Sequence, residues 1–464
     1  MNILLFESHY RSRSWFKALD GLGDIFIVSV NKEEKELFLL DGVKEENILD
    51  LHNPNLADIS LSNAIDYLSK MESSLDFCVN NIVMMDRTLR LTNHEYIAKY
   101  VYLVLLKIHE FIKSKDINIV FMEPTWTHEI VSCLLCKHLN IPVFGPTKCK
   151  ILPNRFFLFT GYLNNEHFIR KNATNGKELA SSLVDTVLAY EKKPQYFDHF
   201  VNKNKFKLEK FKVLYNIIKL SILGKSNVNI QPPWIKSVRK KLTAILRSPY
   251  LLKFARFVKQ SDISSPYILI PLHVQPEATI DVLGAKFTDQ IDFVRQIVRT
   301  TPVDHLIVVK EHPHAIGDRD SHFYKQLTSM SRVLILNPYE DSRMAIERAS
   351  FVISNTGTGS LEAAIIGIPS VTATEMYFNE LLVSPSFNPV TDSVADLLIK
   401  SEAWKKKFSI INIKDQLSNI KKNTFEGNPG AFNLDPTVLS NSNIDNLKLA
   451  FSEAINFYTT SRNK

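Results

Sequence analysis

The sequence of 464 residues contains only four cysteines, Cys78, Cys133, Cys136 and Cys149. Four cysteines are too few for disulfides to stabilise a chain of this length, so we expect a protein of a reducing compartment, the cytoplasm. Cys133 and Cys136 form a closely spaced pair, but the other two do not stand at zinc-ligand spacing from it. We therefore expect no metal site and no redox centre.

Long apolar runs are also missing. The amino terminus, MNILLFESHYRSR, has only a handful of apolar residues before Glu7, which is too short for a secretory signal. The most apolar stretch, residues 96–113, is interrupted by two lysines, a histidine and a glutamate, which a membrane span rarely accepts. A chain with 45% hydrophobic residues can nevertheless bury large cores, and at this length we expect a two-domain enzyme.

Positive charge is concentrated in one segment. Residues 191–260 carry a net charge of +14, which leaves −7 for the rest of the chain. Apolar residues recur between these charges at helical spacing, which is typical of amphipathic helices that lie on an anionic membrane surface. A solvated connector that packs on its own protein fits the pattern equally well. No nucleic-acid-binding motif accompanies the charge, so we expect no nucleic-acid partner.

Short apolar runs alternate with segments of helical periodicity in both halves of the chain. This alternation predicts parallel sheets covered by helices on both faces, an α/β fold with two doubly wound, Rossmann-like domains. The expected strands lie at 2–6, 25–30, 117–124, 266–272, 305–313, 332–338, 351–357 and 368–374.

The expected domains follow from this alternation. We expect an N-terminal Rossmann-like domain at 1–190, the basic helical segment at 191–262, and a C-terminal Rossmann-like domain at 263–435. At 436–464 an apolar stripe predicts a final helix that packs across the domains.

The stretch VISNTGTGSLEAAIIGIPSV predicts an anion site. An apolar strand ends at Ser354, and a helix is expected to begin near Ser360 with Glu362 in its first turn. Glycines admit close backbone approach to a phosphate, and hydroxyls and helix amino-terminal N–H groups donate to it. The candidate ligands are Ser354, Thr356, Gly357, Thr358, Gly359, Ser360 and Glu362. The loop matches neither the Walker motif nor GxGxxG, and a tight turn capped by a hydroxyl remains the alternative.

Two other strand ends are expected at the same edge of this sheet. VVKEHP offers His312 as a donor to a phosphate and Lys310 as a positive charge on the same side of its strand. PLHVQPEAT offers His273, with Gln275 and Glu277 available for hydrogen bonds or acid and base work, or else forms an ordinary turn. Arg319 could clamp an anionic substrate, but we expect it to pair instead with Asp318 or Asp320 on the surface.

In the first half, Glu123 ends the strand INIVFM and is our candidate general base, although it could instead serve the amino end of the following helix. Polar residues also follow the first strand, at His9, Arg11 and Arg13, and the apolar run NNIVMM, at Asp86 and Arg87.

Together, PLHVQPEAT, VVKEHP and SNTGTGSLEAAIIGIPSV resemble bacterial capsule and surface polysaccharide biosynthesis proteins, including the Kdo-transferase type. The resemblance extends over about residues 266–380. It implies a GT-B fold with the nucleotide sugar in the C-terminal domain and the acceptor in the N-terminal one. It also implies that His312, Pro313 and the hydroxyls of 354–358 contact the nucleotide phosphate, and it matches Gln275, Pro276 and Glu277 to a Gln-Pro-Glu motif.

We therefore expect a metal-independent glycosyltransferase that requires no cofactor, with Glu123, Glu277 and His312 as catalytic residues. The resemblance favours a CMP-sugar donor such as CMP-Kdo and a surface polysaccharide or lipid-linked glycan as acceptor. The expected location is cytoplasmic, against the inner membrane. The alternatives are a nucleotide-sugar epimerase or hydrolase on the same fold, a UDP-sugar-dependent transferase, and a non-catalytic polysaccharide assembly protein.

Overall fold

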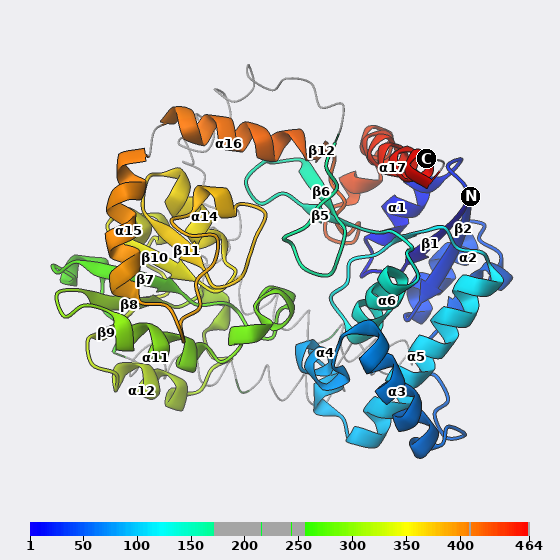
Figure 1. The fold of residues 1–464 in the computed structure, drawn as a ribbon, viewed down its shortest axis with the longest axis horizontal. Coiled ribbons are helices and arrows are strands. Elements are labelled where there is room, and N and C mark those ends of the chain that lie inside the picture. Colours follow the sequence, from blue (N-terminus) through cyan, green and yellow to red (C-terminus); the bar gives the residue numbers. More distant parts are fainter. Residues whose placement is uncertain (171–214, 216–242, 244–255, 408–409, 463–464) are drawn as a thin grey trace. The chain divides into compact units, whose positions relative to one another are not determined.

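The structure, a computed structural model, describes residues 1–170, 215, 243, 256–407 and 410–462 (Figure 1). These residues divide into two compact units. The first contains residues 1–170 and 421–462, and the second contains residues 256–407 and 410–420. Most of the predicted basic segment, 191–262, lies outside the described residues, so its helices and its membrane contact remain predictions.

The first unit is built on a seven-stranded sheet in the order β12-β6-β5-β4-β1-β2-β3. Strands β1 to β5 are parallel to one another, whereas β6 is antiparallel to both β5 and β12. The strands are β1 (Asn2–Phe6), β2 (Asp24–Ser29), β3 (Ile48–Asp50), β4 (Ile119–Phe121), β5 (Val143–Lys148), β6 (Arg155–Phe159) and β12 (Phe425–Glu426).

Helices cover the first sheet because its central strands are apolar on both faces. They are α1 (Ser12–Leu19), α2 (Lys32–Leu40), α3 (Leu61–Leu75), α4 (Val79–Met85), α5 (His94–Ser114), α6 (Thr127–His138) and α17 (Asn441–Arg462). Helix α17 packs against α1, and its Phe451 ring lies 4.7 Å from the ring of Phe121, centroid to centroid. The last helix therefore completes the core of the first unit.

The second unit contains a five-stranded, fully parallel sheet in the order β11-β10-β7-β8-β9. Its strands are β7 (Tyr267–Pro271), β8 (Leu306–Lys310), β9 (Val333–Leu336), β10 (Phe351–Ser354) and β11 (Ser370–Thr372). Its helices are α11 (Gln290–Thr300), α12 (Ser321–Thr328), α13 (Ser342–Glu347), α14 (Thr358–Ile365), α15 (Val394–Lys407) and α16 (Ile410–Lys422), the last of which extends to the boundary between the units.

The predicted α/β class is confirmed, because the sheet of each unit winds outward from its first strand and its strands, apart from β6 and β12, are parallel. The chain returns to the first unit after α16: β12, inside the predicted domain 263–435, pairs with β6 of the first sheet. The contacts of α17 with α1 and β12 also lie within that unit. No helix in the described part of the chain is long and apolar enough to cross a membrane.

Candidate functional site

Each sheet has a point where its winding direction reverses. In the second unit β8 and β9 lie on one side of β7, and β10 and β11 on the other. In the first unit β1 lies between β2 and β4 in the same way. Because open α/β sheets bind ligands outside the carboxyl ends of the strands at such a reversal, two edges are candidate sites. We call them the second edge, after β7 and β10, and the first edge, after β1 and β4.

At the second edge, His273 meets the loop that follows β10. The backbone nitrogen of Thr356 lies 3.5 Å from Nε2 of His273. A Cβ atom on Gly357 would lie 3.2 Å from Cε1 of the same ring, so glycine leaves room for the imidazole. Burial, together with the nearby charge of Arg319, lowers the pKa of His273 to about 4. The ring is therefore neutral at pH 7.

The helix after this loop begins earlier than expected. Helix α14 starts at Thr358 with Gly357 as its N-cap, and no side chain caps it. The predicted start near Ser360 is wrong, and so is the hydroxyl cap of the alternative interpretation. Because of the earlier start, the exposed Glu362 lies beyond the first turn, which holds no acidic residue. The amino-terminal N–H groups of α14 therefore face the edge without a side-chain acceptor.

Three hydroxyls predicted to bind an anion instead brace the loop. The Ser354 and Ser360 oxygens are 2.7 Å apart, and Ser360 donates to the carbonyl of Val371 at 2.7 Å. Thr356 donates to the carbonyl of Thr279 at 2.8 Å. Because these hydroxyls are already used, the backbone N–H groups at the amino end of α14 remain as donors for an anion.

Lys310 is the last residue of β8 and His312 follows it, on the opposite side of β7 from β10. Two strand spacings, about 10 Å, therefore separate the ends of β8 and β10. The Lys310 ammonium donates to the carbonyl of Pro338 at 2.7 Å, in the loop after β9, and burial lowers its pKa to about 8. Lys310 thus links the end of β8 to the loop after β9, on the side away from β10. That His312 and Thr356 share one ligand remains a prediction.

Arg319 was expected on the surface, and this expectation is wrong. Its guanidinium donates to Oε2 of Glu311 at 2.6 Å, with side-chain exposures of 10% for Arg319 and 0% for Glu311. The same carboxylate accepts from the Tyr324 hydroxyl at 2.9 Å and, through Oε1, from the His312 backbone N–H at 2.7 Å. Arg319 also donates to the backbone carbonyl of His273. This buried pair therefore ties the end of β8 to the end of β7.

Gln275 and Glu277 follow β7 in the same loop. The Gln275 amide donates to Asp281 at 2.8 Å and accepts from Gln290 at 3.2 Å, so it stabilises the loop. The backbone N–H of Glu277 also donates to Asp281, at 3.1 Å, while the residue itself is exposed. The Gln275 side chain is therefore bonded within the loop, whereas the Glu277 side chain is exposed at the second edge.

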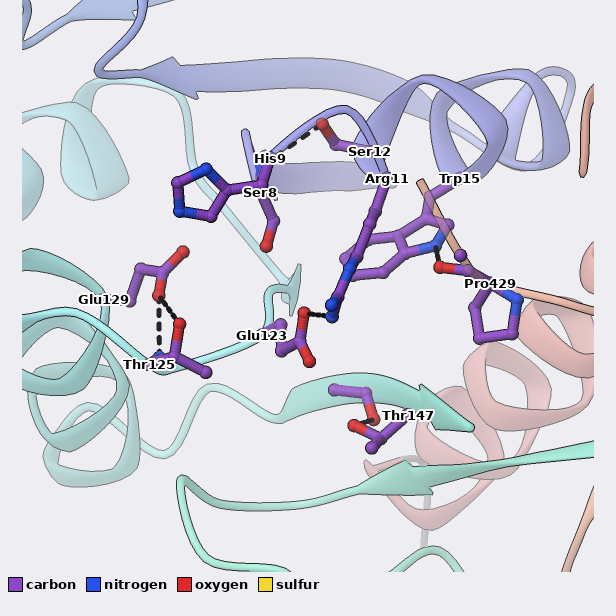
Figure 2. Close-up of polar contacts among 12 residues, drawn as sticks. Ser8, His9, Arg11, Ser12, Trp15, Glu123, Thr125, Glu129, Thr147 and Pro429 are labelled. Carbon is purple, nitrogen blue, oxygen red and sulfur yellow. Dashed lines mark hydrogen bonds and ion pairs between the residues drawn. The ribbon is translucent and has the colours of Figure 1, made fainter. Parts of the chain in front are cut away.

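At the first edge, residues from both strand ends converge (Figure 2). Arg11, after β1, forms an ion pair with Glu123, after β4. The amino end of α6 is bonded instead by Glu129, whose Oε2 accepts from the N–H groups of Thr125 at 2.7 Å and Trp126 at 3.0 Å. The alternative role of Glu123, serving that helix end, is therefore filled by another carboxyl group.

His9 is held by an indole. The Nε1–H group of Trp126 donates to Nε2 of His9 at 2.7 Å, and the Arg87 guanidinium lies 3.6 Å from the centroid of the indole ring. Burial, followed by the charges of Arg87 and Arg11, lowers the pKa of His9 to about 4. Because an indole N–H can only donate, Nε2 is the acceptor and the neutral ring carries its proton on Nδ1.

A buried carboxyl pair supports the turn that presents His9. His9 and Tyr10 both adopt left-handed backbone conformations, with φ of 42° and 62°. Their N–H groups donate to Glu7 at 3.3 Å and to Glu34 at 2.8 Å. Burial raises the pKa of both carboxyl groups, which also hydrogen-bond each other. Left-handed backbone conformations at two successive residues are costly and persist only when surrounding hydrogen bonds hold them. Such conformations are typical of functional sites.

Sequence reasoning missed Glu7, Glu34 and Glu129, and it gave His273 no central role. Glu129 could have been found from its place in the first turn of the helix that follows β4, at the reversal point. Nothing in the sequence pairs Glu7 with Glu34, because the contact joins β1 to α2. The cysteines Cys133 and Cys136 are free and buried, and no group of three potential metal ligands occurs in the part of the chain that was described.

No protein-family model and no curated protein matches the chain. Among solved structures, it is similar to the glycosyltransferase of kitacinnamycin at 11% identity and a TM-score of 0.31, with 98% of each chain covered. It is also similar to KpsC of Thermosulfurimonas dismutans, a β-Kdo 2,7 transferase, at 13% identity and a TM-score of 0.29. That match covers 68% of this chain and 89% of KpsC. The match to the UDP-GlcNAc 2-epimerase of Methanocaldococcus jannaschii has 15% identity and a TM-score of 0.24, and it covers 87% of this chain and 91% of the epimerase. Values this low carry no function from those proteins to this chain.

Proposed function

We propose that this protein is a nucleotide-sugar-dependent glycosyltransferase whose donor phosphate binds at the second edge. The observation that carries the proposal is the meeting of His273 with the Gly357 loop at the point where the sheet reverses. The uncapped amino end of α14 supplies N–H groups and a favourable dipole for an anion. The neutral His273 ring accepts from the Thr356 N–H through Nε2, which places its own proton on Nδ1.

In the proposed reaction, a hydroxyl oxygen of the acceptor bonds to the anomeric carbon while the bond from that carbon to the phosphate oxygen breaks. Charge then develops on the leaving phosphate, where fixed N–H donors stabilise it without a metal. The proton of the acceptor hydroxyl passes to a carboxylate, for which Glu123 is our candidate. The exposed Glu277 and the neighbouring His312 would contact the donor sugar and its phosphate.

The finer assignment comes from the resemblance of the second-edge motifs. We propose a CMP-sugar as donor and a glycan of surface polysaccharide assembly as acceptor. A cytoplasmic position against the inner membrane would place the protein beside a lipid-linked acceptor, with the basic segment 191–262 as the contact. Sedimentation with vesicles containing anionic lipid, compared with vesicles of neutral lipid, tests that contact.

Nucleotide binding tests the proposal directly. A thermal-shift series with CMP, CDP, UDP and GDP should raise the melting temperature for one base, because a ligand held only by the native state stabilises it. His273→Ala should remove that increase, whereas His322→Ala, on the exposed side of α12, should retain it. If His273→Ala keeps the full increase, the phosphate does not bind at this edge.

A nucleotide-sugar epimerase or hydrolase is the second candidate, and one observation favours it. Burial raises the pKa of Glu129 to about 8, while Glu123 at the same edge is ion-paired with Arg11. A carboxyl group that keeps its proton near neutral pH, beside an ion-paired carboxylate, is suited to acid and base roles in one reaction. Donor turnover in the absence of any acceptor would favour this candidate, and strict acceptor dependence would favour the transferase.

A further inference from the structure

Two buried carboxyl groups of the first unit hydrogen-bond each other. Glu7 directly follows β1, and Glu34 lies in the first turn of α2. They are 3% and 2% exposed. Ionised carboxylates can only accept hydrogen bonds, so a bond from one to the other requires that one of them keeps its proton. Like charges this close in a buried site also oppose ionisation of both groups. The pair therefore holds one proton and one negative charge.

The other contacts of this pair suit a shared proton and not a metal ion. All four carboxyl oxygens accept a hydrogen bond from an N–H or O–H group, namely those of His9 at 3.3 Å, Val30 at 3.1 Å, Tyr10 at 2.8 Å and Ser12 at 3.5 Å. Hydrogens directed at every oxygen would repel a cation, but they stabilise a single negative charge. The amino end of α2 adds a favourable dipole for that charge.

The same hydrogen bonds restrain the turn that follows β1. His9 and Tyr10 have φ of 42° and 62°, which residues other than glycine keep only when the surrounding structure holds them. Their two N–H groups each donate to one member of the carboxyl pair. The turn presents the His9 ring to the indole of Trp126 and leads into Arg11, which pairs with Glu123. The contacts of the first edge therefore depend on the carboxyl pair.

The groups that face the pair and its turn determine how the pair responds to pH. They are Glu129 of α6, Glu33 of α2, the Tyr10 phenol, and the guanidinium groups of Arg11 and Arg87. Both guanidinium groups act on His9, whose ring is neutral near pH 7. Burial, as the largest cause, raises the pKa of both paired carboxyl groups above their ordinary value of 4.5. The stability that the shared proton gives is therefore present at lower pH and is lost as pH rises through the raised value.

We propose that the proton shared by Glu7 and Glu34 is a pH-sensitive latch on the turn that presents His9. With the proton in place, the two carboxyl groups lie together and hold both left-handed residues. When pH rises and the proton passes to solvent, two negative charges face each other in a buried site, so the carboxyl groups separate and the turn relaxes to ordinary backbone conformations. The His9 ring then leaves Trp126. This latch controls the state of the first edge and does not depend on the proposed transferase activity.

Infrared difference spectra of the full chain test the shared proton itself. At about pH 6, where an ordinary glutamate is ionised, wild type minus Glu34→Gln should contain the carbonyl stretch of a protonated carboxyl group, because the variant leaves Glu7 as a lone carboxylate. Wild type minus Glu7→Gln should contain the same band. Glu36→Gln, at an exposed position of α2, is the matched control and should remove only carboxylate bands. If the spectra of both pair variants show only the loss of a carboxylate, no proton is shared and the latch is overturned.

Hydrogen exchange across a pH series tests the release of the turn. After correction for the intrinsic exchange rate, the wild-type peptide that contains His9 and Tyr10 should lose protection about tenfold or more between about pH 6 and about pH 9. Glu34→Gln should keep its protection, because its amide donates to Glu7 at every pH, whereas Glu36→Gln should behave as wild type. Unchanged protection of the wild-type turn over this range would overturn the latch, even if no variant of the pair folds.

Glu129 titrates in the same pH range, so its contribution is measured separately. Its pKa is raised to about 8, and Glu129→Gln should leave the pH-dependent exchange of the turn in place. Loss of that dependence in Glu129→Gln, together with its retention in Glu34→Gln, would assign the effect to Glu129 and overturn the latch. None of these experiments measures activity or nucleotide binding, so failure of the latch and failure of the proposed transferase are distinguishable.

Discussion

Replacement of Arg319 by methionine tests whether the buried pair beneath the second edge is a structural support. The variant leaves Glu311 buried at 0% exposure with only two of its three donors. Breaking a buried ion pair from one side costs about 3–5 kcal/mol, because an uncompensated charge remains. Arg343→Met is the control, since its partner Glu347 lies one turn away on an exposed helix face. Such a pair contributes about 0.3–0.5 kcal/mol.

Urea denaturation gives the free energy of unfolding, and hydrogen exchange locates the loss. A local loss of about 3 kcal/mol corresponds to exchange about a hundredfold faster in peptides that contain β7 and β8. Adding Glu311→Gln to Arg319→Met should recover part of the stability, because the unpaired charge is then removed. If Arg319→Met loses no more stability than Arg343→Met, the pair does not support this edge.

Three further predictions concern other parts of the molecule. Gly357→Ala should weaken nucleotide binding about tenfold, or about 1.4 kcal/mol by thermal shift or calorimetry, because its Cβ would crowd the imidazole at 3.2 Å. Gly161→Ala, which meets open space, should not. The pKa of Glu129 is raised to about 8 in the folded state, so the wild-type protein should lose up to about 1.4 kcal/mol of stability per pH unit between about pH 4.5 and about pH 8. Glu129→Gln should remove this part of the pH dependence, as measured by urea denaturation across that range. Phe451→Ala should cost about 3–5 kcal/mol in urea denaturation, against little for Leu449→Ala, which is 69% exposed.

The parallel sheets could be predicted because their strands are short, apolar runs separated by helical segments, a pattern that local sequence carries. Every strand of the second sheet lies where alternation placed it, and the loop at Asn355 to Gly357 does follow a strand end. The antiparallel strand β12 could not be found in this way. It has two residues, and its pairing with β6 depends on contacts across more than 250 positions.

The functional edges were harder to predict than the strands. His312 and Thr356 were placed on one edge correctly, but sequence gives no strand order, so β7 and its His273 could not be placed between them. The hydroxyls of Ser354 and Ser360 suited an anion by type, yet burial turned them toward each other. Residue type shows which groups can bind a ligand, and tertiary packing decides which of them are left free to do so.

The pairing of β12 with β6 and of α17 with α1 has a consequence for biosynthesis. The ribosome releases the amino-terminal strands first, but Phe121 and Phe156 gain their last neighbours only when residues 421–462 emerge. The second sheet is continuous in the chain and can close earlier. The first unit therefore begins to be translated first but completes its fold last. Until residues 421–462 emerge, the apolar surface that they cover would be accessible to chaperones.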